Sequence, residues 1–170
     1  MMINIRITRR TKTSEILPLL NEDSFNRLLE AVPEHPMKTS VFSMKIRQFA
    51  EILENETVFI EQLLKQKRAL VAFGMVKKYK AEVESLAKFL KMYDYQQTSE
   101  EKQASHGIVY PSMAQRMLTD CVRFFNLKSF NEAEEKTVSD WLTVFQSDAA
   151  TALYQRKLHE AFEKKMKKKK

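Results

Sequence analysis

The sequence predicts an all-α protein, an irregular helical bundle organised around one long central helix. The 170 residues include only two glycines and four prolines, whereas all-β proteins use both repeatedly in turns and nucleotide-binding folds need glycine-rich loops. Apolar residues also recur at steps of three and four, which places them along one side of a continuous helix. They are Ala69, Ala72, Val76, Tyr79, Val83, Leu86, Leu90 and Tyr93.

The first twelve residues are predicted to form an N-terminal arm. Ile3, Ile5 and Ile7 alternate with polar residues, a period of two that is typical of a short strand. A single strand is not stable alone, so the arm either pairs with another chain or forms an ordered coil. Thr13 or Ser14 is expected to start a short helical turn, with Pro18 near its beginning.

Two helices are expected between residues 23 and 53, separated by a linker. Asp23 or Ser24 should cap the first, and Pro33 should end it. Pro33 and Pro36 disfavour helix on both sides and mark the clearest linker in the chain. Thr39 or Ser40 should cap the second helix, whose apolar side carries Phe42, Ile46, Phe49 and Leu53.

The central helix is expected to run from Val58 to Tyr93. The apolar stripe changes phase around Asn55–Thr57, which predicts a break or tight turn there, with an unbroken bent helix as the alternative. Flanking apolar residues widen its stripe, which favours the core of the chain's own bundle over an intermolecular coiled coil. Gly74 falls on the predicted solvent side, where we expect a kink or a close helix crossing.

Short helices joined by tight turns are predicted beyond Tyr95, because the capping-box spacing occurs three times. The pairs are Thr98 with Glu101, Ser112 with Gln115, and Ser129 with Glu132. Gly107 is placed to adopt the left-handed conformation after the first of these helices.

A last helix should begin near Val138 and be interrupted near Ser147–Asp148. Residues 125–129 followed by 137–142 are similar to the helix-turn-helix pattern of DNA-binding proteins. The turn is longer than usual there, and acidic residues would face phosphates. We therefore interpret Thr137 as an N-cap and Trp141 as a core anchor. The domain prediction is an arm at 1–12, one helical domain at 13–163 with a weak sub-boundary near 94–111, and a lysine tail at 164–170.

The net charge of +7 is concentrated in two segments. Residues 65–91 carry eight Lys/Arg against two Glu, and residues 155–170 carry the same numbers. Such segments can attract nucleic acid or an acidic protein without giving sequence specificity. The candidate basic binding patch comprises Lys65, Lys67, Arg68, Lys77, Lys78, Lys80, Lys88, Lys91, Lys164, Lys165, Lys167, Lys168, Lys169 and Lys170.

The motifs of catalysis and of cofactor or metal binding are missing from the sequence. His35, His106 and His159 lie far apart, and no zinc, phosphate-loop or nucleophile-elbow spacing occurs. We expect no catalytic residue, no cofactor and no metal. Cys121 is the single cysteine, and its apolar neighbours predict a buried thiol in a reducing compartment. Without an apolar run long enough to span a bilayer, we expect a cytoplasmic protein with no membrane partner.

These observations predict a non-catalytic scaffold, adaptor or assembly factor that acts through contacts with a protein partner or through self-association. Small helical proteins of phage and mobile-element assembly modules have this general character, which is an analogy only. In that case the protein would be virion-associated. The alternative is a nucleic-acid-binding accessory protein that uses the two lysine-rich segments, with weak, non-specific binding. A motif-poor enzyme is the third hypothesis.

Overall fold

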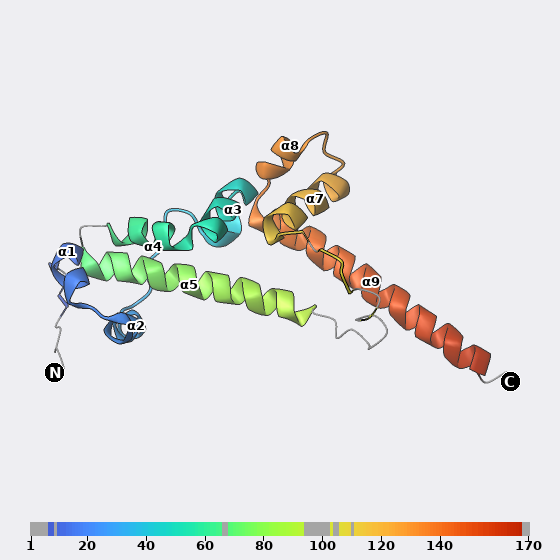
Figure 1. Ribbon diagram of the computed structural model, residues 1–170, viewed down its shortest axis with the longest axis horizontal. Helices are drawn as coiled ribbons and strands as arrows, with labels where there is room; N and C mark the ends of the chain where they lie inside the picture. Colours follow the sequence, from blue (N-terminus) through green and yellow to red (C-terminus); the bar gives the residue numbers. More distant parts are fainter. Residues whose placement is uncertain are drawn as a thin grey trace. The chain divides into compact units, whose positions relative to one another are not determined.

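A computed structural model of the chain describes residues 7–8, 10–65, 68–93, 103, 106–109 and 111–167, without the side chains of residues 163, 165 and 167 (Figure 1). These residues form helices and connecting segments with no strand among them, which confirms the all-α prediction. The helices are α1 (Thr13–Ile16), η1 (Leu17–Leu19), α2 (Glu22–Ala31), η2 (Val41–Ser43), α3 (Ile46–Glu54), α4 (Glu56–Leu64), α5 (Ala69–Met92), α7 (Met113–Phe125), α8 (Phe130–Glu134) and α9 (Val138–Lys167).

The chain divides into two compact units. The first comprises Met1–Met44 with Gln48–Phe89, and the second comprises Lys45–Arg47 with Leu90–Lys170. The division after Phe89 precedes the weak sub-boundary expected near 94–111. The assignment of residues 13–163 to one domain stays a prediction.

The core of the first unit follows the apolar stripe of α5. Phe73 meets Phe25 of α2 with ring centroids 5.5 Å apart, and Tyr79 meets Phe59 of α4 at 5.0 Å. The chain's own helices thus cover the stripe, as the bundle interpretation predicted. The buried residues of α5 are Ala69, Ala72, Phe73, Gly74, Met75, Val76, Tyr79, Glu82 and Leu86.

The central helix begins at Ala69, so its predicted start at Val58 is wrong. The expected break at Asn55 occurs, but α4 is a separate helix that ends at Leu64. At the start of α5, the Ala69 N–H donates to the Thr11 carbonyl at 2.9 Å, beside an antiparallel bridge between Lys12 and Arg68. The first N–H groups of a helix have no partner within it. Thr11, at the end of the N-terminal arm, supplies the hydrogen-bond acceptor for the first N–H group of α5, at the residue where the helix begins.

Gly74 is buried, and its predicted place on the solvent side is wrong. The linker after α2 lies against it: the His35 N–H donates to the Gly74 carbonyl at 3.1 Å. A Cβ at Gly74 would stand 2.7 Å from the Pro33 carbonyl oxygen. The close approach that glycine permits is therefore made by the proline linker rather than by a crossing helix.

Some boundaries in the first unit are as predicted and others are shifted. α1 begins at Thr13 and α2 ends before Pro33, as expected. Asn21, rather than Asp23 or Ser24, caps α2: the Ser24 N–H donates to Asn21 Oδ1 at 2.9 Å. Ser40 precedes the short helix η2, and α3 starts only at Ile46, so the predicted continuous helix after Ser40 is wrong.

The second unit is built from α7, α8 and the first half of α9. Trp141 is 2% exposed and donates from Nε1 to Asp120 Oδ2 at 3.2 Å, while Met117 and Cys121 of α7 are fully buried. The Thr137 N–H donates to Asp140 Oδ2 at 2.8 Å, and the Asp140 N–H donates to Thr137 Oγ1 at 3.1 Å. These contacts confirm the N-cap and the core anchor.

The capping boxes of the second unit differ in completeness. Ser112 and Gln115 exchange both hydrogen bonds, as predicted. Ser129 Oγ accepts from the Glu132 N–H at 3.4 Å, but the Glu132 carboxylate turns to the Lys128 N–H at 3.1 Å. Gly107 has φ +82°, in the left-handed region expected for it.

Helix α9 is continuous to Lys167, so the interruption expected near Ser147–Asp148 is wrong. Thr151 Oγ1 donates to the Ser147 carbonyl at 3.0 Å within the unbroken helix. The first residues of the predicted lysine tail therefore lie in α9. Ile3, Ile5, the Thr98–Glu101 box and Lys168–Lys170 fall outside the described residues.

Candidate interaction surfaces

Two lysines of the candidate basic patch hold the first unit together. Lys77 Nζ donates to the carbonyls of Glu30 and Val32, each at 2.8 Å, and so satisfies the last carbonyls of α2. Lys78 Nζ lies 3.2 Å from the Glu34 carboxylate and 3.8 Å from that of Glu82. Both ammonium groups are engaged with the chain's own backbone or carboxylates.

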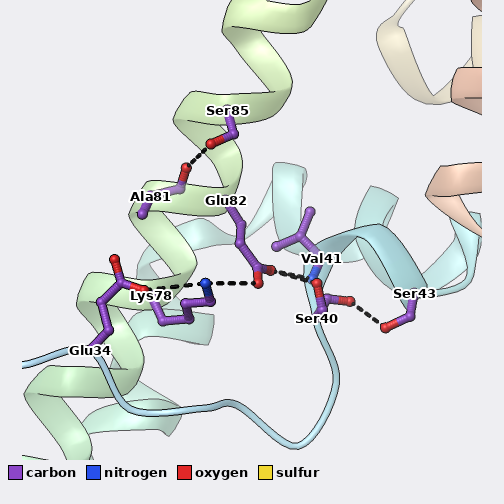
Figure 2. A network of polar contacts seen from close by, with 8 residues as sticks. All are labelled: Glu34, Ser40, Val41, Ser43, Lys78, Ala81, Glu82 and Ser85. Carbon is purple, nitrogen blue, oxygen red and sulfur yellow. Dashed lines mark hydrogen bonds and ion pairs between the residues drawn. The ribbon is translucent and has the colours of Figure 1, made fainter.

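Figure 2 shows the polar network around Glu82, whose side chain is buried under the loop before α3. Glu82 Oε2 accepts from Ser40 Oγ at 2.9 Å and from the Val41 N–H at 2.7 Å. Among the described residues, no buried side-chain nitrogen or oxygen lacks a hydrogen-bond partner. The network fastens the linker and η2 to α5, and its partners are all supplied by this chain.

The remaining patch residues are spread along the chain. Lys80 Nζ lies 5.9 Å from the ring of Phe25, and Lys88 pairs with Glu84 at 2.8 Å. Lys65, Arg68, Lys91 and Lys164 are exposed. Nothing is described for Lys67 and Lys168–Lys170, nor for the side chains of Lys165 and Lys167. Their assignment as a binding patch stays a prediction.

A groove of about 440 Å³ opens in the first unit between the loop before α3 and helices α3, α4 and α5. We call it the methionine groove, because three methionines contribute to its wall. Residues Gln48–Leu64 beside it include four exposed glutamates and no lysine or arginine. The groove is lined by Met37, Lys38, Thr39, Met44, Gln48, Glu51, Ile52, Phe59, Gln62, Leu63 and Met75.

The outer segment of α9, Ala150–Lys167, carries a row of uncovered apolar side chains. Every side chain described from Ala150 to Met166 is exposed. We call Tyr154, Leu158, Phe162 and Met166 the α9 row; they are 67%, 43%, 57% and 69% exposed. A spacing of four keeps neighbouring members on one side of a helix. Lys157 and Lys164, seven residues apart, share another side.

The second unit has a wider groove, of about 890 Å³, bordered by Tyr93, Trp141 and Phe145. Its charged side chains pair with one another: Arg123 binds Asp148 and lies 3.9 Å from Asp120. Arg116 lies 3.8 Å from Asp120, and its guanidinium is 5.5 Å from the ring of Phe145. Lys91 also lines the groove and is exposed, so the lining carries three basic side chains against two carboxylates.

The buried groups with shifted pKa values, Cys121 and Tyr79, take part in core packing. Burial, together with the charges of Asp120 and Asp140, raises the pKa of the Cys121 thiol to about 11. The thiol is therefore protonated at neutral pH and behaves as a small buried hydrophobe. Burial first, and then Glu56, raises the pKa of Tyr79. Within the described residues, no group of three or more metal-ligating side chains occurs.

Sequence reasoning missed the methionine groove, because a loop and three helices form it together. The apolar positions Leu158, Phe162 and Met166 predict a helix toward the C-terminus, but no surface was assigned to them. The signal that could have identified a surface is the spacing of four from Tyr154 to Met166, whose only large apolar neighbour is Leu153, whereas several large apolar residues widen the stripe of α5.

Comparisons with models of known protein families, with curated proteins and with solved structures found no match for this chain. None of the helices described is long and apolar enough to cross a membrane. The surfaces of the two units are therefore the basis for inferring a function.

Proposed function

We propose that this protein is a non-catalytic helical adaptor or assembly factor that acts through protein contacts, with the outer segment of α9 as its binding element. One observation carries the proposal: four large apolar side chains stand exposed along a helix that no described residue of its own unit covers. By analogy with phage and mobile-element assembly proteins, it would work in the cytoplasm or associated with a virion.

A partner would stabilise the outer segment as well as bind it. Most of the stability of a helix in a protein comes from packing of its apolar side, and in the outer turns of α9 every described side chain is exposed. The Arg156–Glu160 pair is a contact within the helix. Burying one large apolar side chain contributes about 1.5–3 kcal/mol. Covering the α9 row would therefore supply the packing that α5 receives from its own unit.

The charge around the row specifies the partner's surface. Residues 155–170 carry eight Lys/Arg against two Glu. An interface of this kind suits an acidic rim around an apolar centre. Nucleic acid is less well supported, because Lys77 and Lys78 are engaged within the first unit and a phosphate backbone would leave the α9 row uncovered.

Site-specific crosslinking in the native host tests the proposal. A photo-reactive amino acid at Leu158 should yield covalent adducts with protein. The same group at Phe130, an α8 side chain that is 55% exposed, is the control and should yield few. Adducts with nucleic acid at Leu158, or none at all, would contradict the adaptor function.

A salt titration of nucleic-acid binding separates the two leading functions. We expect weak, sequence-indifferent binding at low salt and none of consequence at physiological salt. A nucleic-acid-binding protein would bind tightly there, and the logarithm of its affinity would fall by about 0.9 per phosphate contacted for each unit in log salt.

A further inference from the structure

Two surfaces of opposite character occur on the same chain. The α9 row is apolar, and the segment that carries it is strongly basic. The methionine groove is concave and partly apolar, and the helices α3 and α4 beside it expose Glu51, Glu54, Glu56 and Glu61.

We propose that the α9 row of one copy of this protein docks into the methionine groove of a second copy. This inference rests on the proposed function and names its partner. Methionine side chains are flexible and make favourable contacts with aromatic rings. Met37 is half-buried, and Met44 and Met75 are 6% and 8% exposed, so Met37 is the methionine most able to adapt to Tyr154 or Phe162. Lys157 and Lys164, beside the row, would lie against the glutamates of α3 and α4.

Charge selects this contact over a symmetric one. Packing two α9 rows against each other would bring together two segments that each carry eight Lys/Arg against two Glu, and like charges across an interface oppose association. The segment Gln48–Leu64 carries four glutamates and no basic residue. Lys38 and Glu51 both line the groove, so the complementary charge is that of helices α3 and α4 around the groove and not of the lining itself.

The contact is heterologous, because different surfaces of the two copies meet. Each bound copy still presents one unused row or one unused groove. Such contacts build rings when the rotation closes and filaments when it does not. Self-assembly of this kind gives the adaptor a definite product, a chain or ring of identical subunits.

Sedimentation velocity of the full chain over a range of concentrations, at physiological salt, tests the inference with two variants. The row variant is Leu158→Glu with Phe162→Glu. The groove variant is Glu51→Lys with Gln62→Lys, two exposed residues of the groove lining. Each should fold, because every changed side chain is exposed, and circular dichroism checks this. We expect each alone to associate at least about 30-fold more weakly than the natural sequence.

Mixing the two variants gives the sharper result. The groove variant keeps an intact α9 row and the row variant keeps an intact groove, so an equimolar mixture should form a one-to-one heterodimer and nothing larger. The control Ile108→Glu with Val109→Glu adds the same negative charge as the row variant, at exposed apolar residues of the second unit. It should associate as strongly as the natural sequence.

Three outcomes would overturn the inference: a natural chain that is monomeric at every concentration, a groove variant that still associates, or a mixture that stays monomeric. The crosslink at Leu158 distinguishes this failure from failure of the proposed function. A monomeric protein whose Leu158 still crosslinks to another protein remains an adaptor with a different partner.

Discussion

Helix α5 and the outer segment of α9 carry similar patterns of apolar residues, but those of α5 are buried and those of α9 are exposed. Both are lysine-rich helices with apolar side chains at helical spacing. In α5, Ala72, Val76 and Tyr79 are at most 1% exposed, whereas the α9 row is 43–69% exposed. Apolar spacing thus identifies a helix and its apolar side, but it does not say whether that side meets the same chain or another one.

The composition of the two rows explains part of the difference. The buried side of α5 includes Ala69, Ala72 and Gly74, small residues that let other backbone come close. The Pro33 carbonyl would lie 2.7 Å from a Cβ at Gly74. The α9 row consists only of large side chains, which project from a helix and suit a partner with its own cavity.

Truncating one leucine in each helix should give the largest difference. Leu86 is 2% exposed, so Leu86→Ala should lower the free energy of unfolding by about 2–5 kcal/mol. Leu158→Ala on α9 and Lys88→Ala on the exposed side of α5 should each cost less than about 0.5 kcal/mol. Urea denaturation measures all three, and equal small effects at Leu86 and Leu158 would remove α5 from the core.

Gly74→Ala should destabilise the protein by about 1–3 kcal/mol, because the added methyl meets the Pro33 backbone. Intrinsic helix propensity alone predicts the opposite, a gain of about 1 kcal/mol. Ala87→Gly, at an exposed residue of the same helix, is the matched control and should follow propensity with a loss of about 1 kcal/mol. A stabilising Gly74→Ala would show that the proline linker does not lie against α5.

Glu82→Gln should cost about 1–2 kcal/mol, since the amide keeps one acceptor but weakens the bonds from Ser40 and Val41 and loses the charge facing Lys78. Glu84→Gln removes an exposed pair with Lys88, and such pairs contribute little. Thermal unfolding of the two variants compares them. Equal melting temperatures would mean that the Glu82 network does not hold the linker.

The sequence predicted the long helix, most of its buried side and the caps of the second unit, because these depend on residues close together in the chain. Ser112–Gln115 and Thr137–Trp141 are examples. The predictions failed where distant segments meet. The carbonyl of Thr11 lies at the start of α5, and the Pro33 carbonyl lies so close to Gly74 that only glycine fits there. The methionine groove was missed for the same reason, while the basic patch was assigned without knowing that Lys77 and Lys78 had partners in α2 and the linker.

The central claim is that the α9 row is a binding surface and the stripe of α5 is core. Leu158→Glu with Phe162→Glu tests it most directly when stability and binding are measured on the same sample, with Ile108→Glu and Val109→Glu as the control. We predict a free energy of unfolding within about 0.5 kcal/mol of the natural chain. Self-association of the variant, measured by sedimentation velocity, should be weaker by at least about 30-fold. A loss of stability above about 2 kcal/mol, as expected for a buried row, or unchanged binding would contradict the account.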